Sequence, residues 1–480
     1  GVIAADYIYN ELGARKLATI HDGSPYGEGL VTVVAERFAE LGGEVVASDA
    51  VNVGDTDFRG LLEDIAQAEP DLIYFGGFAA EAARLAMQRA DTGLEDVEFM
   101  GADGIKGTEV ISLGASAVEG VYASAAMPAS SDALTSFYDR YLEAYGEEPP
   151  APYHANGYDG VNLFLDAVEA VGVVDEDGNL QIDRDALAAY IRSVSDFQGL
   201  TGVLNADGTG EMSVADIGIS QIVDGAFVDL AVGRIADGEV VITAVEPVAE
   251  EAAAEEPAAE EAAATEEAAA EEEPAAEEAA ATEEAAVEEE AAPEATEEAA
   301  VEEAEATEEA VEVAAEPTAA PEVAMGENVV TVAAGESVVV GLAAGLSGEG
   351  IAPLGIDIQR GAEMALQDRP TVTVGGVEFT VALDAQDDLC SADGGQAVAN
   401  RAVSTEGIVG VVGPMCSSAC RAAAPIFDAA GYTTISPSCT AADLTTSGYS
   451  SFNRAVVSDA FQGVIAADYI YNELGARKLA

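Results

Sequence analysis

The chain has 480 residues, 49% of them apolar, enough to bury the core of one two-lobed domain or of two to three ordinary ones. It carries 90 Asp and Glu against 18 Lys and Arg, a formal net charge of −72. A surface this acidic repels the phosphates of nucleic acids and anionic membranes, so nucleic-acid binding is excluded. No apolar run reaches the roughly 20 residues that a membrane-spanning helix needs.

The first part of the chain alternates short apolar strands with amphipathic helices. The predicted strands are 16–21, 44–50, 72–75, 98–101 and 120–125. The predicted helices are 27–41, 58–68, 80–92, 132–145, 157–171 and 184–194, and a strand-rich tail follows to about residue 241. Strands bounded by Gly and Asp that alternate with helices of this length are typical of parallel sheets covered by helices.

The next segment, 246–325, is a low-complexity run of Ala, Glu, Pro and Thr. The 77 residues from 246 to 322 include 30 Glu and no Lys, Arg or Asp. Such a segment has almost no large apolar side chain whose burial could offset the entropy lost on ordering. Neighbouring glutamates repel one another and prolines interrupt any long helix. We therefore expect a disordered acidic linker.

After the linker the strand–helix alternation resumes. The predicted strands are 337–342, 377–385, 408–412 and 433–436. The predicted helices are 355–368, 395–405, 417–430 and 460–474. The chain thus has two α/β segments, 1–245 and 326–480, on either side of the linker.

Residues 1–18, GVIAADYIYNELGARKLA, recur without change as residues 463–480. An identity of this length does not arise by chance, so the sequence closes on itself with a period of 462 residues. The chain is either one window of a tandem array or a circularised fragment of a repetitive gene. In both cases we expect that residue 1 is not a biological start and that the missing signal sequence carries no information.

The four cysteines lie within 50 residues, separated by 25, 3 and 18 others. The sequence numbers are Cys390, Cys416, Cys420 and Cys439. Such a cluster is compatible with disulfides or with a metal site. Zinc sites usually have shorter C-x-x-C spacings and histidines. Disulfides in an oxidising compartment are therefore the better interpretation.

Other chemical signals in the sequence are weak. The only two histidines, His21 and His154, cannot support a catalytic Ser-His-Asp or Cys-His assignment, and structural roles are favoured for both. Residues 175–183 resemble a calcium loop but lack its ligand spacing, so a β-turn is favoured. No G-x-G-x-x-G or Walker pattern is present. We expect no enzyme activity, no cofactor and no metal site.

Several motifs identify a family when 326–480 is placed before 19–245. They are DAQDDLCSADGGQAVAN, VGVVGPMCSSAC, TTISPSCTAADLT, IHDGSPYGEGL, DLIYFGGF, FMGADGIKG and PYHANGYDGV. In this order the chain resembles the branched-chain amino-acid (Leu/Ile/Val) binding proteins of ABC import systems, which are type I periplasmic binding proteins. The resemblance implies an α/β fold of two Rossmann-like lobes with parallel sheets, joined by a three-crossing hinge around a ligand cleft.

The same resemblance divides the chain into functional segments. It implies that 1–245 is the second half of a solute-binding domain, 246–325 the linker, and 326–480 the first half. Lobe one would comprise 335–461 and 128–196, and lobe two 19–127 and 197–245 with one copy of the duplicated segment. We expect the copy 1–18 to fill that position, because the strand 16–21 then continues without a break.

The polar ligand residues can be carried over from the family one by one. The resemblance implies that Ser417, at a helix start, holds a ligand carboxylate, although an N-cap serine would look the same. Ser438 and Thr440 match the loop that meets the carboxylate and the ammonium group, with turn chemistry after Pro437 as the alternative. Asp103 replaces the family's glutamate and would accept hydrogen bonds from the ammonium group, with a shorter reach.

The remaining site predictions concern aromatic residues and cysteines. Tyr26, Phe78 and Tyr153 match the lining of the family's pocket, although aromatic residues at such spacing are more often core. Cys390 and Cys416 match the family's disulfide. For Cys420 and Cys439 we predict a second bridge that would attach the ligand loop to the neighbouring helix, with two buried thiols as the alternative.

The implied function is an extracytoplasmic receptor that captures an amino acid, branched-chain or similar, and delivers it to an ABC permease. Its partners would be this small ligand and the permease subunits. A membrane tether outside this sequence is also expected. Two alternatives stay open: a ligand-sensing receptor domain on the same scaffold, and a repeat unit of a tandem cell-surface array.

Overall fold

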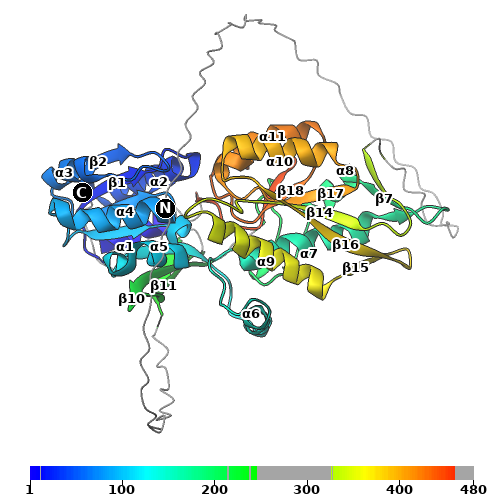
Figure 1. Ribbon diagram of the computed structural model, residues 1–480, viewed down its shortest axis with the longest axis horizontal. Coiled ribbons are helices and arrows are strands. Elements are labelled where there is room, and N and C mark those ends of the chain that lie inside the picture. Colours follow the sequence, from blue (N-terminus) through cyan, green and yellow to red (C-terminus); the bar gives the residue numbers. More distant parts are fainter. Residues whose placement is uncertain (11, 213–215, 237–238, 246–325, 327, 460–480) are drawn as a thin grey trace, which may run out of the picture. The chain divides into compact units, whose positions relative to one another are not determined.

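The computed structural model describes residues 1–10, 12–212, 216–236, 239–245, 326 and 328–459. The expected linker, the helix expected at 460–474 and the second copy of the duplicated segment, 463–480, lie outside the described residues. Among the residues described, no helix combines the length and the apolar character needed to cross a bilayer. Two large sheets, each covered by helices, organise the described chain (Figure 1).

We call the eight-stranded sheet and its helices lobe two. Its strand order is β12-β11-β10-β5-β4-β3-β1-β2. The strands are β1 (Lys16–His21), β2 (Glu44–Ala50), β3 (Leu72–Gly76), β4 (Glu98–Gly101), β5 (Tyr122–Met127), β10 (Asp216–Val223), β11 (Ala226–Ala236) and β12 (Glu239–Ala244). Strands β1 to β5 are all parallel to one another. Strands β10, β11 and β12 extend the sheet with antiparallel pairing. The five strands predicted from the alternating pattern are thus parallel, as expected, and the strand-rich tail makes the sheet mixed.

Alternation of side chains along the strands of lobe two gives the sheet two buried faces. Leu17 and Tyr74 pack toward one helical layer, while Ala18 and Phe75 pack toward the other. The first layer contains α1 (Val2–Asn10) and α2 (Pro25–Leu41). The second contains α3 (Arg59–Gln67), α4 (Ala79–Arg89) and α5 (Thr108–Gly114). Three short 3-10 turns, η1 (Ala90–Thr92), η2 (Asp103–Ile105) and η3 (Ala115–Val118), complete this lobe.

We call the six-stranded sheet and its helices lobe one. Its order is β15-β16-β14-β17-β18-β19, and only β15 is antiparallel to its neighbour. The strands are β14 (Val338–Ala344), β15 (Thr371–Val374), β16 (Val377–Asp387), β17 (Ile408–Val412), β18 (Thr434–Ser436) and β19 (Phe452–Arg454). One face is covered by α7 (His154–Val171) and α9 (Ala352–Asp368), and the other by α10 (Ala392–Ser404) and α11 (Ser417–Ala429) (Figure 1).

Smaller elements complete the described structure. They are α6 (Asp132–Tyr145), α8 (Arg184–Ile191), the sheet β13 (Val329–Val332), β7 (Leu180–Asp183) and β6 (Val173–Val174), and the hairpin β8 (Phe197–Gln198) and β9 (Val203–Leu204). Asp175 accepts hydrogen bonds from the amides of Asp177 and Asn179 at 2.9 Å each, between β6 and β7. Residues 175–179 of this acidic segment thus form the turn that the sequence favoured, and 180–183 continue as β7.

Segments from both sides of the linker build lobe one together. β13 pairs antiparallel with β7, so residues 329–332 and 180–183 share one ladder. Arg184 donates to the backbone oxygens of Ile408 and Val409 at 2.6 and 3.0 Å. Its guanidinium lies 3.5 Å from the centroid of the Tyr432 ring. Residues 151–212 and 330–456 also share a single apolar core.

Two expectations about the fold need correction. Residues 197–212 were expected in lobe two, but Leu204 and Met212 are buried in the core of lobe one, and Glu211 forms an ion pair with Arg454 of β19. The chain therefore returns to lobe two only at β10. Strand β13 was not anticipated as a separate element. Gly335, in the left-handed region with φ of 89°, separates it from β14, where a glycine avoids the steric cost of a side chain.

Residues 1–18 occupy the position expected for the duplicated segment. They supply α1, in which Ile3, Tyr7 and Ile8 are buried, and the first half of β1, which lies between β3 and β2. The strand Lys16–His21 is continuous.

Candidate functional site

A small cavity of about 20 Å³ is lined by residues of both lobes. Most of the lining residues follow the carboxyl ends of parallel strands, where ligand sites of open α/β sheets occur, whereas Tyr153 lies between α6 and α7. They are Tyr26, Phe78, Asp103, Gly104, Tyr153, Leu354, Met415, Cys416, Ser417 and Ser438. Six of the seven predicted ligand residues are among them, and the seventh, Thr440, is buried two residues beyond Ser438.

Helix starts surround this cavity. Tyr26 lies in the first turn of α2, Phe78 and Tyr153 precede α4 and α7 directly, and Ser417 is the first residue of α11. The first N–H groups of a helix lack intrahelical partners, and the helix dipole adds positive potential there. The lining is therefore suited to a ligand that carries a negative group.

The start of α11 is braced by the loop after β18. The hydroxyl of Ser438 donates to the carbonyl of Met415 at 2.8 Å, and the amide of Ala441 donates to the Ser417 hydroxyl at 3.3 Å. The amide of Met415 in turn donates to Asp388 at 2.7 Å. Both serines thus lie on backbone whose position is fixed by other segments.

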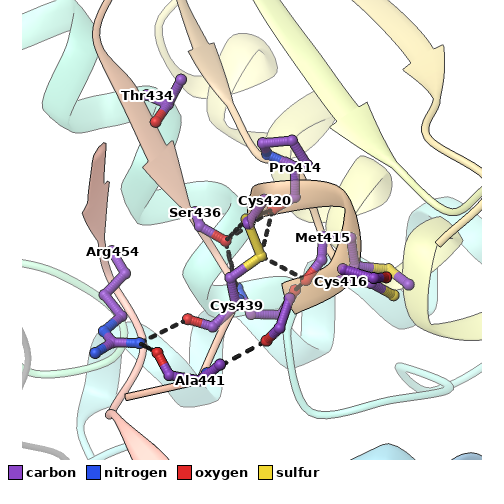
Figure 2. Close-up of a disulfide and its surroundings, with 12 residues drawn as sticks. Pro414, Met415, Cys416, Cys420, Thr434, Ser436, Cys439, Ala441 and Arg454 are labelled. Carbon is purple, nitrogen blue, oxygen red and sulfur yellow. Dashed lines mark hydrogen bonds between the residues drawn. A yellow bond between two sulfur atoms is a disulfide. The ribbon is translucent and has the colours of Figure 1, made fainter. Parts of the chain in front are cut away.

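Two disulfides hold the same region. Cys390 is bonded to Cys416, with Cα atoms 5.0 Å apart, and Cys420 is bonded to Cys439, with Cα atoms 6.6 Å apart. The second bridge joins α11 to the loop that carries Ser438 and Thr440, which is the pairing predicted from the sequence (Figure 2).

Hydrogen bonds inside the loop reinforce this second bridge. The hydroxyl of Ser436 donates to the carbonyl of Pro414 at 2.7 Å and accepts from the amide of Cys439 at 2.9 Å. The fully buried Arg454 donates to the carbonyls of Cys439 and Ala441 at 3.0 and 2.9 Å (Figure 2). The loop backbone is therefore held from both sides.

On the lobe-two side, Asp103 supplies a buried carboxylate. It accepts hydrogen bonds from the hydroxyl of Tyr26 at 3.0 Å and from that of Tyr153, and the Tyr26 oxygen accepts from the amide of Gly104 at 3.0 Å. Burial raises the pKa of Asp103, and the hydrogen bonds from the two tyrosines partly oppose this shift. Burial also raises the pKa of both tyrosines well above the usual range, so their hydroxyls stay protonated donors.

The remaining wall of the cavity is apolar. The rings of Tyr26 and Phe78 pack with centroids 5.4 Å apart, and Leu354 and Met415 are buried beside them. A serine-rich helix start, a carboxylate and an apolar wall thus converge on one cavity.

Three buried carboxylates near this site were not anticipated from the sequence: Asp357, Asp388 and Asp459. The amide of Asp459 donates to the carbonyl of Thr440 at 2.7 Å. Burial, followed by repulsion from Asp103, raises the pKa of Asp459 to about 7. No local sequence pattern identifies Asp357, because its partners Tyr153 and His154 are distant along the chain.

The histidines take structural positions. The ring of His21 accepts from the amide of Gly23 at 3.1 Å, and the ring of His154 lies 3.0 Å from the carbonyl of Ala151 and 3.2 Å from the hydroxyl of Tyr138. Among the residues that the structure describes, no cluster of His, Cys, Asp and Glu could hold a metal ion.

The curated relatives are amino-acid-binding proteins by name. The chain is 31% identical over 211 residues to Leu/Ile/Val-binding protein homolog 1 of Brucella abortus, which covers 44% of this chain and 54% of the relative. It is 26% identical over 216 residues to the leucine-, isoleucine-, valine-, threonine- and alanine-binding protein of Pseudomonas aeruginosa, covering 45% and 55%. The chain thus spans about half the length of the curated relatives it matches.

Solved structures show similar partial matches. A leucine-binding protein of Thermotoga maritima aligns with a TM-score of 0.42 and 30% identity, over 48% of this chain and 63% of the other. A branched-chain amino acid transporter substrate-binding protein of Streptococcus pneumoniae, in complex with isoleucine, aligns with a TM-score of 0.40 and 25% identity, over 47% and 64%.

The family model gives the broadest match. It is described as periplasmic binding protein, and it matches residues 3–226 and 337–480, on both sides of the expected linker. These two segments contain the cavity-lining residues and most of both sheets. The chain therefore belongs to the periplasmic binding protein family.

Proposed function

We propose that this protein is an extracytoplasmic receptor that captures an amino acid between its two lobes and delivers it to an ABC permease. The favoured ligand is a branched-chain amino acid or a similar small zwitterion. One observation carries the proposal: Ser417 at the start of α11 and Ser438 of the loop after β18 line the same cavity as the buried carboxylate of Asp103.

The two sides match the two charged groups of an amino acid. The first N–H groups of α11 and the hydroxyls of Ser417 and Ser438 suit the ligand carboxylate. Asp103 suits the ammonium group, because a buried cation needs a carboxylate partner. Phe78, with Leu354 and Met415, offers an apolar wall to an aliphatic side chain.

Ligand entry requires these residues to move. A cavity of about 20 Å³ has room for about one water molecule and not for an amino acid. The hydroxyls of Tyr26 and Tyr153 also occupy the Asp103 carboxylate. We therefore propose that the lobes separate to admit the ligand, and that its ammonium group replaces the Tyr26 hydroxyl on Asp103 while the Tyr153 hydroxyl closes again on the other carboxylate oxygen.

Three further lines support the proposed setting. The curated relatives are named for the binding of leucine, isoleucine and valine. Two disulfides fit an oxidising compartment outside the cytoplasm. Delivery to a permease, and a tether to the membrane through a segment outside this sequence, are proposed from family membership. The role proposed is binding and not catalysis.

The direct test is calorimetric titration of the protein with leucine, isoleucine, valine, alanine, glutamate and urea. At least one branched-chain amino acid should bind, and 4-methylpentanoate, which lacks the ammonium group of leucine, should bind much more weakly. If none of the amino acids binds, or if urea binds best, the proposed ligand class is wrong.

A pair of variants localises the binding. Asp103→Asn should weaken the binding of the amino acid by at least about thirtyfold, because it leaves a buried ammonium group without its charged partner. Asp159→Asn is the matched control: Asp159 is equally buried, but it accepts hydrogen bonds from Leu200 and Thr201, away from the cavity. Equal affinities in the two variants would place the ammonium group elsewhere.

A further inference from the structure

We infer that Asp357 is a positioning residue for ligand capture, although it does not line the cavity. It holds Tyr153, whose hydroxyl meets Asp103 of the other lobe. The inference rests on the proposed function. It adds a residue, Asp357, that acts on the site by holding Tyr153.

The contacts of Asp357 are made with the start of α7. Asp357 lies in α9 and is fully buried. One of its carboxylate oxygens accepts from the backbone amides of Tyr153 and His154, at 2.7 Å each. Tyr153 makes no side-chain cap of its own for α7. The Asp357 carboxylate of α9 therefore accepts hydrogen bonds from two amides at the N-terminal, positive end of α7.

The backbones of α7 and α9 approach closely in the turn of α9 that follows Asp357. A Cβ atom on Gly361 would lie 1.9 Å from the carbonyl oxygen of His154, and one on Gly157 would lie 2.4 Å from that of Ile358. Both distances are far below van der Waals contact, so only glycine allows this crossing. The position of Tyr153 is thus fixed relative to α9.

The ring of His154 packs beside the same carboxylate. Its Nδ1 atom lies 3.2 Å from each Asp357 oxygen and 3.0 Å from the carbonyl of Ala151. The ring stacks on Phe137 of α6 with centroids 5.7 Å apart. Asp357 is therefore enclosed by groups that limit its own rotation.

This arrangement connects the two lobes through three residues. Asp357 in lobe one fixes the backbone of Tyr153, and the Tyr153 hydroxyl donates to Asp103 in lobe two. Loss of the Asp357 carboxylate would free Tyr153 to leave Asp103 and the cavity wall. The affinity for ligand would then fall although no ligand contact had been removed.

The test measures the affinity for L-leucine in a mutant cycle of Asp357→Ala, Tyr153→Phe and the double variant. Asp357→Ala should weaken binding about tenfold, because part of the binding free energy would then be used to order Tyr153 again. In the Tyr153→Phe background the same change should have little further effect. Asp357→Asn should restore most of the affinity, because an amide oxygen can accept from the same two N–H groups.

Asp183→Ala provides the matched control. Asp183 caps α8 by accepting from the amides of Asp185 and Ala186, at 2.9 and 3.2 Å, and it has no contact with the cavity. It should lower stability with little change in affinity. If Asp357→Ala and Asp183→Ala change the affinity equally, or if the Asp357 effect persists in full in the Tyr153→Phe background, the positioning role is refuted.

A crystal structure of the Asp357→Ala protein separates this inference from the proposed function. If the wild-type protein does not bind leucine or its analogues, the proposed function fails, and the position of Tyr153 still decides the inference. The hydroxyl of Tyr153 should be displaced from Asp103 in the variant. An unchanged hydrogen bond between Tyr153 and Asp103 would overturn the inference.

Discussion

At the scale of single residues, a few aspartates are buried although the protein is strongly acidic and other acidic side chains are exposed. Asp159 is fully buried and accepts hydrogen bonds from the amides of Leu200 and Thr201 and from the Thr201 hydroxyl. Burial raises its pKa to about 6, although these hydrogen bonds act in the opposite direction. Such a group makes stability depend on pH in a direction opposite to that of a surface ion pair.

We predict that the Asp159 carboxylate destabilises the fold as the pH rises. The unfolded chain releases this proton near pH 3.8 and the folded chain near pH 6, so between these values folding is disfavoured progressively. The loss is on the order of 3 kcal/mol and stays constant above about pH 6. Urea unfolding between pH 3.5 and 7.5 should show a flatter pH profile for Asp159→Asn than for the wild type.

Asp183 is a control because its contribution to stability should change with pH in the direction opposite to that of Asp159. The amide of Gly326 and the first amides of α8 lower its pKa, so its contribution to stability is present above the unfolded value of 3.8 and is lost as the pH falls. Asp183→Asn should therefore remove a stabilisation that grows with pH. If Asp159→Asn steepens the profile in the same direction as Asp183→Asn, burial is not the dominant cause for Asp159.

Residues of the candidate site differ in how well the sequence could predict them. Six predicted residues line the cavity, and five of them, including Ser417, Asp103 and Tyr26, follow strand ends in motifs with a recognisable order. Their roles toward a ligand remain predictions. Asp357 was missed because its partners, Tyr153 and His154, lie more than 200 residues away and on the other side of the linker.

At the scale of elements, the loop after β18 is fixed by a disulfide and by hydrogen bonds from other segments. The bridge between Cys420 and Cys439 attaches it to α11, and the bridge between Cys390 and Cys416 attaches the start of the same helix to the segment before α10. The two bridges thus connect the first turn of α11 to two different segments of lobe one.

We predict that the Cys420–Cys439 bridge forms in solution and supports the ligand loop. Thiol counting on denatured, non-reduced protein should find no free thiol, and two reactive thiols would refute the bridge. The double variant Cys420→Ser, Cys439→Ser should lose on the order of 3 kcal/mol of unfolding free energy, as expected for a loop of this length. Leucine affinity, measured on folded protein, should fall as well.

Elements with strong local signals were predicted to the residue, and those fixed by distant partners were not. The strands at 16–21, 44–50, 98–101 and 408–412 have the expected bounds, because apolar runs end there at Gly, Asp or similar breakers. Strand β13 forms by pairing with β7, which is distant in sequence. Residues 197–212 belong to lobe one because Leu204 and Met212 are buried in its core. Neither cause can be found within a local window of sequence.

At the scale of the whole molecule, the two described segments form one folded unit. Residues 1–245 and 328–459 share the β7–β13 ladder, the core of lobe one and the hydrogen bonds of Arg184. The fold should therefore depend on these contacts and not on the covalent connection through 246–325. We propose on this basis that the two segments are halves of one solute-binding domain in reversed order.

We predict that the protein survives cleavage between the halves. A protease site placed between Ala285 and Ala286 should allow complete cleavage, after which the two fragments should elute together and bind leucine like the intact protein. Arg184→Ala, which removes hydrogen bonds between the halves, should make the cleaved fragments separate at a lower urea concentration. Immediate separation of wild-type fragments would contradict a domain built from both halves.

The central claim is that opposite ends of a zwitterion meet opposite sides of one cavity. A crystal structure with leucine, or with whichever amino acid binds best, tests it directly. The account predicts the ligand carboxylate within hydrogen-bond distance of Ser417 and the first amides of α11, and the ammonium group within hydrogen-bond distance of Asp103. A ligand bound away from these residues, or with its two charged groups reversed, would contradict it.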